Sequence, residues 1–174
     1  MQLPGKEVFF DKDEFIVSKT NLKGHITYAN DVFLDIAGYT EAEVIGQPHS
    51  MIRHPDMPRC VFKLLWDKVQ NGKEVFAYVV NSTKSGDYYW VIAHVTPSWG
   101  PNGDIIGYHS TRRRPEAKIV QEKIIPLYTS LNAIENGHKS RKDGLAASFA
   151  ELVRMIEEQD LEYEEFIAQL MRAA

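Results

Sequence analysis

The chain has 174 residues, of which 44% are hydrophobic, and carries a formal net charge of −4 at pH 7. This length fits one domain of roughly 100–150 residues plus an appendage, and the slightly acidic balance argues against a nucleic-acid-binding surface. The sequence has no apolar run of about 18 residues and no signal peptide, so it predicts a soluble cytoplasmic protein. Its one cysteine, Cys60, allows no internal disulfide.

Two short strands are predicted near the N-terminus. Residues 13–19 and 24–29 have strand composition, and the turn-forming residues 20–24 between them indicate a hairpin. Asn30 or Asp31 can then cap a short helix, because side chains of this type accept hydrogen bonds from the first free backbone N–H groups.

Helical signals continue to residue 72. Thr40-Glu41-Ala42-Glu43 has the pattern of a capping box and predicts one more short turn of helix. A longer helix is predicted from about Met57 to Gln70, where apolar residues recur at helical spacing, and Asn71-Gly72 closes it.

Three further strands are predicted, at about 73–83, 87–97 and 104–113. The tight turns at 84–87 and 100–103 are short enough to make these strands an antiparallel meander. Two strands, several helices and three strands together predict an α+β fold. We expect a five-stranded antiparallel sheet with helices on one face and a pocket between them.

A helical tail is predicted after residue 115. Apolar residues recur from 119 to 134, and Pro126 is expected to kink or restart that helix. From Leu145 to Leu170 the apolar steps alternate between four and three residues, which is the period of a helix that packs along one seam. The alternatives for this seam are packing against the chain's own first helix, self-association, and docking to another protein.

The segment from Arg53 to Pro58 combines a cation, an imidazole and a carboxylate within four positions. Pro55 and Pro58 restrict the backbone before and after them. The planar fork of Arg53 suits a phosphate or a carbonyl edge. An ordinary surface turn, with Asp56 capping the next helix, is the alternative interpretation.

No enzyme signature accompanies this segment. The sequence has no Gly-x-Ser-x-Gly elbow and no glycine-rich loop that opens a helix, and its six histidines lack metal-ligand spacing. Cys60 lies at the start of an apolar helix, where a buried structural thiol is favoured over a nucleophile. We therefore expect neither catalysis nor a metal site.

Aromatic residues favour a planar cofactor instead. Flat rings can stack on a flavin or haem, and the candidates are Trp66, Tyr78, Tyr88, Tyr89 and Trp90. Asn81 falls inside a predicted strand, where an amide must be paired, and its donor and acceptor match the edge of a pyrimidine-like ring. A solvent-facing strand end is the alternative for Asn81.

The order of elements and several motifs resemble a PAS domain, and more narrowly the FAD-binding PAS domain of aerotaxis and energy-taxis receptors. The motifs are Ile26-Thr27-Tyr28-Ala29-Asn30, Gly38-Tyr39, Gly46-Gln47-Pro48-His49, Arg53-His54-Pro55-Asp56-Met57-Pro58, Trp66 and Asn81-x-x-Lys84-x-Gly86-Asp87-x-Tyr89-Trp90-Val91. The chain lacks the Asn-Cys-Arg-Phe-Leu motif of the light-sensing branch, so flavin–cysteine photochemistry is not expected.

The resemblance implies a PAS sensor domain at 14–114, preceded by a segment at 1–13 and followed by helices for signalling or association at 115–174. It implies non-covalent FAD and a cofactor-binding set of Asn30, Arg53, His54, Asp56, Trp66 and Asn81, with Tyr89 and Trp90 as weaker additions. In this interpretation Arg53 meets the flavin or its phosphates, and Asp56 fixes the loop.

The implied function is a cytoplasmic redox or energy sensor, of the stand-alone type found in bipartite energy-taxis systems. Such a protein would relay the redox state of its flavin to a membrane-bound, methyl-accepting chemotaxis partner, and a homodimer is also possible. Two alternatives stay open. One is haem-based gas sensing through His54, His94 or His109, and the other is a cofactor-free interaction module.

Overall fold

The computed structural model describes residue 1 and residues 3–172, which fold as two compact units. The first, called here the sheet unit, comprises residues 3–55 and 68–115. The second, the helical unit, comprises residues 56–67 together with the chain from Glu116 onward. One boundary between the units therefore follows Pro55, just before the predicted long helix, and another falls inside that helix, between Asp67 and Lys68.

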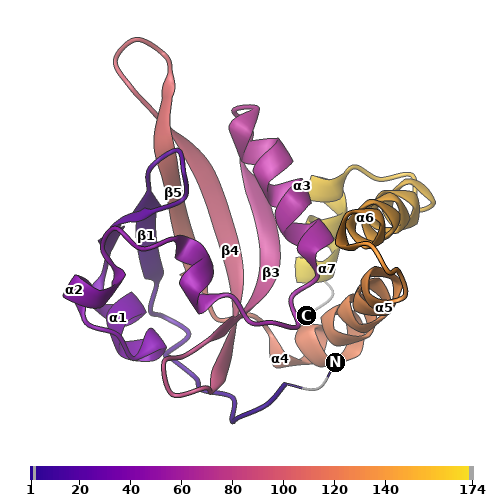
Figure 1. The fold of residues 1–174 in the computed structure, drawn as a ribbon, viewed down its shortest axis with the longest axis horizontal. Coiled ribbons are helices and arrows are strands. Elements are labelled where there is room, and N and C mark those ends of the chain that lie inside the picture. Colours follow the sequence, from indigo (N-terminus) through magenta and orange to yellow (C-terminus); the bar gives the residue numbers. More distant parts are fainter. Residues whose placement is uncertain (2, 173–174) are drawn as a thin grey trace. The chain divides into compact units, whose positions relative to one another are not determined.

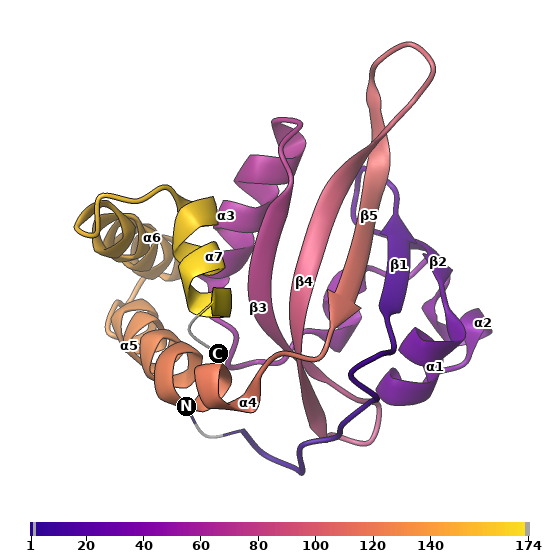
Figure 2. The same ribbon diagram turned by 180° about the vertical axis from the view of Figure 1, so that it is seen from behind.

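The sheet unit is built on five antiparallel strands in the order β2-β1-β5-β4-β3 (Figures 1 and 2). The strands are β1 (Ile16–Thr20), β2 (Ile26–Ala29), β3 (Val75–Ser82), β4 (Tyr88–Trp99) and β5 (Ile105–Arg113). Each lies within one to three residues of its predicted bounds. The predicted five-stranded antiparallel sheet is confirmed.

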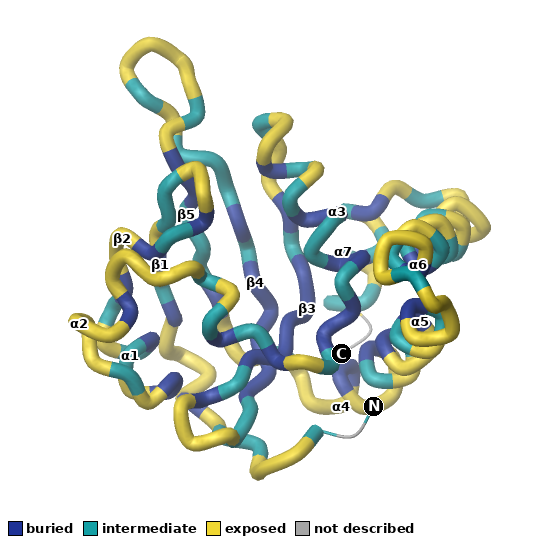
Figure 3. Tube along the Cα trace, viewed as in Figure 1, coloured by how far each residue is buried: buried dark blue, intermediate teal, exposed yellow. Residues whose placement is uncertain are grey.

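Strand pairing fixes which side chains share a face of this sheet. Asn81 pairs with Tyr89, and Arg112 pairs with both Ile16 and Ala93. Because directly opposed residues point to the same side of a sheet, these residues lie on one face, and their neighbours in sequence lie on the other. Figure 3 shows that much of β3 and β4 is buried, although β3 is the edge strand of the sheet.

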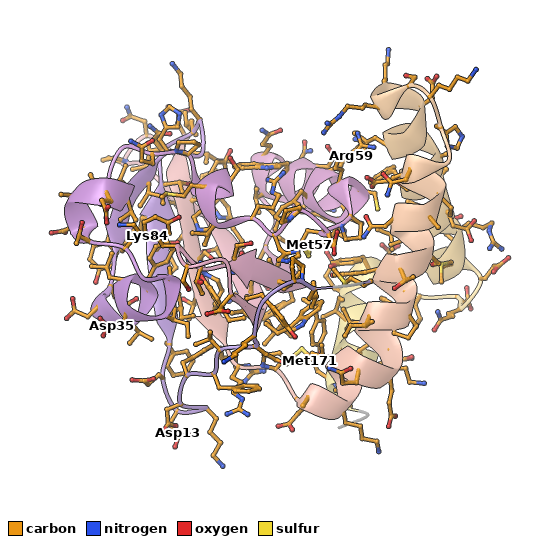
Figure 4. The ribbon with its side chains drawn as sticks, turned by 60° about the horizontal axis from the view of Figure 1, so that its bottom comes forward. Asp13, Asp35, Met57, Arg59, Lys84 and Met171 are labelled. Carbon is orange, nitrogen blue, oxygen red and sulfur yellow. The ribbon has the colours of Figure 1, made fainter. Side chains whose placement is uncertain are left out.

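Short helices follow β2, as the sequence predicted. They are α1 (Asp31–Ala37), α2 (Glu41–Val44) and the 3₁₀ turn η1 (His49–Ile52). Asn30 caps α1, the capping box of Thr40 and Glu43 is formed, and Gly38 ends α1 with a left-handed φ of 74°. Lys84, seen beside these helices in Figure 4, forms an ion pair with Glu43 at 2.5 Å.

The helical unit combines the beginning of α3 (Arg59–Gln70) with the C-terminal helices. These are α4 (Ala117–Ile119), the π-helical turn η2 (Val120–Ile124), α5 (Ile125–Asn136), α6 (Arg141–Glu157) and α7 (Tyr163–Arg172). Pro126 stands in the first turn of α5, and the π turn lies just before it. The chain stays helical from Ala117 through Asn136, so Pro126 coincides with the change from the π turn to the α-helix and not with a break in the helix.

One carboxylate fastens α3 to the C-terminal helices. The Glu135 side chain, on α5, accepts hydrogen bonds from Arg59 Nε at 2.7 Å, the Cys60 backbone N–H at 3.0 Å and the Ser148 hydroxyl at 2.9 Å. Figure 4 shows Arg59 directed toward α5. A carboxylate from α5 thus serves as the cap of α3, where free N–H groups attract negative charge.

The predicted seam from Leu145 to Leu170 is not one helix. Helix α6 ends at Glu157, and Asp160 takes a left-handed φ of 55° before α7 begins at Tyr163. Leu152, Ile156, Tyr163 and Ile167 are buried within the helical unit, with Val61 and Leu64 of α3 lining the same apolar hollow. The seam residues thus pack against α3, the long helix, whereas the prediction named the chain's first helix.

No helix in residues 1 and 3–172 is both long enough and apolar enough to cross a bilayer.

Candidate functional site

Four polar side chains gather on one face of the sheet, where β1, β3, β4 and β5 lie side by side. They are Ser18, Asn81, Tyr89 and Arg112, and each has under 4% of its surface exposed. We call them, together with Arg53 and His49 described below, the donor cluster. Trp90 follows Tyr89 in an extended strand and lies on the opposite face, so the structure does not bring it together with Asn81 and Tyr89.

Arg53 and Asn81 are brought together from positions 28 residues apart. Their backbones form an isolated antiparallel bridge, which joins the proline-rich segment to the end of β3. Burial lowers the pKa of Arg53 from its usual value, although the group stays charged. The Asn81 amide nitrogen is buried and makes no hydrogen bond within the described residues, so it is available as a donor.

Arg112, Ser18 and His49 form a chain of polar contacts. Arg112 Nη2 donates to the Ser18 hydroxyl, which also lies 3.2 Å from His49 Nε2. Burial, and then the charges of Arg112 and Arg53, lower the pKa of the half-buried His49 to about 3. His49 is therefore neutral at pH 7, and the two arginines supply the positive charge of the cluster.

Tyr89 adds a buried hydroxyl to this face. Burial raises the pKa of Tyr89 to about 12, against the opposing influence of the Arg112 charge and the Asn81 amide. The amide is close enough to affect the phenol, yet the two do not reach hydrogen-bond geometry. Tyr89 is thus a neutral donor at any physiological pH.

The remaining residues of the sequence-predicted set are divided between the units. His54 is buried in the sheet unit, with its ring 6.2 Å from that of Tyr88. Asp56 and Trp66 belong to the helical unit, in which the Asp56 carbonyl accepts a hydrogen bond from Asn132 at 2.5 Å. That contact is made by the Asp56 backbone, so the role expected of its carboxylate stays a prediction.

Asn30 serves the fold. Its Oδ1 accepts from the backbone N–H groups of Val17 and Phe33, and its Nδ2 donates to the Phe15 carbonyl at 2.8 Å. These three bonds tie the end of β2 to β1 and α1. A direct cofactor contact would have to replace one of them.

Ser18, His49 and Arg112 were not predicted as site residues. Arg112 is the first of three consecutive arginines, a run that by itself suggests an exposed strand end. Neighbouring residues of β5 point to opposite faces of the sheet, so Arg112 and Arg113 lie on different faces. Only the pairing of Arg112 with Ala93 shows that Arg112 is the one on the face of the donor cluster. Ser18 and His49 have no signal in the sequence beyond the Gly-Gln-Pro-His motif.

Two of the three histidines proposed for haem, His94 and His109, do not share this face. His94 and Thr111 pair across β4 and β5, and so do Thr96 and His109, which puts both histidines on the face opposite Arg112. His94 stacks on Phe76 at 4.1 Å and contacts Glu74, and His109 contacts Thr111. Within the described residues, no three His, Cys, Asp or Glu side chains are arranged to hold a metal ion.

Comparison with known proteins relates this fold to sensor domains. A family model described as PAS fold matches residues 26–112, which is half of the chain. The aerotaxis receptor of Escherichia coli (strain K12) is 42% identical over 121 residues, which cover 70% of this chain and 24% of the receptor. Phototropin-1A of Oryza sativa subsp. japonica is 28% identical over 92 residues, which cover 52% of this chain and 10% of that protein.

Solved structures show the same fold. A light-oxygen-voltage domain studied with a flavin analogue superposes with a TM-score of 0.57 at 17% identity, over 67% of this chain and 87% of that one. The light-state structure of the aureochrome-1 light-oxygen-voltage domain gives 0.57 at 15% identity, over 66% of this chain and 91% of that one. The chain spans about a quarter or less of the two curated relatives named above.

Proposed function

Because the chain belongs to the PAS-fold family, we propose that its sheet unit binds a flavin, without a covalent bond, and acts as a non-catalytic sensor of redox or energy state. The observation that carries this proposal is the donor cluster. Asn81 Nδ2 and two nitrogens of Arg112 are buried without an acceptor in the described residues. Buried donors of this kind are costly unless a ligand satisfies them.

A flavin ring offers the hydrogen-bond acceptors that the donor cluster lacks. Its pyrimidine edge alternates carbonyl oxygens and ring nitrogens, so it can accept from Arg112 and Asn81 together. Its apolar body suits the surrounding wall, in which Ile16, Phe33 and Ala93 have less than 5% of their surface exposed. When bound, a flavin would supply reversible uptake of electrons, and the protein would supply orientation and charge.

FAD is the flavin that we propose, because the chain is 42% identical to the aerotaxis receptor over 121 residues and its Arg53–Pro58 segment resembles that of FAD-binding energy-taxis receptors. Arg53 and His54 would hold the cofactor from this segment. A change in hydrogen bonding at the edge of the flavin ring would pass through the backbone bridge between Arg53 and Asn81 into the loop that precedes α3.

The test is to release any cofactor from the purified full chain by heat and identify it by chromatography. The proposal predicts FAD at about one per chain. FMN alone would correct the nucleotide, and a chain that contains no flavin and takes up neither FAD nor FMN would refute the proposal. Asn81→Leu should reduce flavin content, whereas Asn102→Ala, in the exposed loop between β4 and β5, should not.

We also propose that the sensor reports to a methyl-accepting chemotaxis partner, as a stand-alone protein or as part of a longer chain. The aerotaxis receptor relationship supports this, and the helical unit, which begins three residues after Arg53, is the proposed output. Removing residues after Gly137 would not test this cleanly, since Ser148 and Leu152 belong to the core of that unit. Light scattering of the full chain, with and without the signalling portion of a chemotaxis receptor, distinguishes a complex from a homodimer.

A further inference from the structure

Arg112 is a buried cation for which the described residues supply no anionic partner. It lies near the end of β5, which is flanked by β1 and β4, and only 2% of its surface is exposed. Among the residues that the structure describes, no carboxylate forms an ion pair with it. Since an uncompensated buried charge is strongly destabilising, this arrangement is costly unless a ligand completes it.

The guanidinium is held in place but only partly satisfied. Nη2 donates to Ser18, and Cζ lies 5.3 Å from the ring centroid of Phe33, while Nε and Nη1 are buried and find no acceptor among the described residues. Burial lowers the pKa of Arg112 to about 10, so the charge persists at neutral pH. Its neighbour Arg113 is exposed on the other face of the same strand.

The residues around Arg112 indicate whether the hydrogen-bond acceptor that it lacks is a phosphate or the edge of a planar ring. A phosphate is strongly hydrated, and the residues that pair with Arg112, Ile16 and Ala93, are apolar and have less than 5% of their surface exposed. Asn81 presents a second unsatisfied donor on the same face. Two donors on an apolar wall match the carbonyl-bearing edge of a planar heterocycle.

We propose that Arg112 contacts the pyrimidine edge of the flavin ring and that its fixed charge raises the reduction potential of the bound flavin. This rests on the proposed flavin binding and extends it to a residue that sets the potential. Reduction by dithionite transfers two electrons to the ring, which takes up one proton and gains one negative charge. A buried cation beside that charge stabilises the reduced form more than the oxidised form.

The experiment compares Arg112→Met and Arg112→Lys with Arg113→Met as the matched control. Dissociation constants are measured for FAD and for riboflavin, which carries no phosphate, and midpoint potentials are measured by dithionite titration. Arg112→Met should weaken the binding of both oxidised flavins about tenfold. The binding of reduced flavin should weaken by a further factor of about ten. This difference corresponds to a midpoint potential lower by about 30 mV for this two-electron couple. Arg113→Met should match the unaltered protein.

Every outcome of this experiment either supports or overturns the proposal that Arg112 contacts the flavin ring. Weaker binding of FAD with unchanged binding of riboflavin would make Arg112 a phosphate contact and overturn it, and so would an unchanged potential in folded Arg112→Met. If Arg112→Met does not fold, Arg112→Lys decides alone. It keeps the charge and loses the fork, so the proposal requires weaker riboflavin binding at a potential near that of the unaltered protein. An unaltered chain that binds no flavin overturns this proposal and the proposed function together.

Discussion

Replacing Glu135 tests how the C-terminal helices are attached to the start of α3. Glu135 is 5% exposed and accepts from Arg59, from the Cys60 backbone N–H and from Ser148. Glu135→Ala removes all three acceptor contacts at once. The Cys60 N–H would then be buried at a helix N-terminus without a partner.

The magnitude follows from these contacts. A hydrogen bond to a charged group contributes ~1.5–3 kcal/mol, and removing one partner of a buried ion pair costs ~3–5 kcal/mol. The Arg59 side chain is 27% exposed, so water will recover part of its loss. We therefore expect Glu135→Ala to lower the free energy of unfolding by about 3 kcal/mol. Glu135→Gln loses the charge and the Arg59 contact but keeps an oxygen that can accept from the Cys60 N–H and Ser148, so its loss should be about 2 kcal/mol.

The assay is urea denaturation followed by far-ultraviolet circular dichroism. Glu157→Gln is the matched control, because Glu157 is exposed at the end of α6, and its effect should stay within about 0.5 kcal/mol. If Glu135→Ala destabilised the chain no more than this control does, the Glu135 contacts would not hold the helical unit together.

Three further changes test the fold and the site. Asn30→Ala should lower the free energy of unfolding by about 2 kcal/mol in the same urea assay, because it removes a helix cap and two more hydrogen bonds; a loss under ~0.5 kcal/mol would contradict this. His49 has a folded-state pKa of about 3 against an ordinary 6.5, so as pH falls from 7 to 5 only the unfolded chain takes up its proton. Stability should fall over that interval by at most ~2 kcal/mol, and His49→Gln should remove this component of the pH dependence; an unchanged slope would be the contrary result. Burial raises the pKa of Cys60 to about 11, so iodoacetamide at pH 8 should modify the native chain about 100-fold more slowly than the unfolded chain, and equal rates would refute its burial.

Much of the fold could be predicted because its signals are local. Turn residues at 84–87 and 100–103 mark the meander, and Asn30 caps α1 by accepting from a backbone N–H three residues away. The division of the helical tail was harder to predict. The apolar period of the sequence continues through residues 158–162, whereas the helix is interrupted there by the left-handed backbone at Asp160. A pattern of apolar residues carries no information about the backbone angle of a single residue.

The candidate site could be predicted only in part, because its members meet through strand pairing. Alternation shows that Tyr89 and Trp90 point to opposite faces, but which of them faces Arg112 depends on the register between β4 and β5. Arg112 and Ser18 are 94 residues apart, and nothing in either segment alone indicates that they touch. Arg53 and Asn81 were both predicted through the family resemblance, although their bridge was not.

The most direct test of the central claim, flavin binding in the sheet unit, is the absorption spectrum of the purified full chain before and after dithionite. The account predicts the two bands of oxidised flavin in the near-ultraviolet and blue, their loss on reduction, and their return when air is admitted. A chain that stays colourless after incubation with excess FAD, or that shows a Soret band, would contradict it.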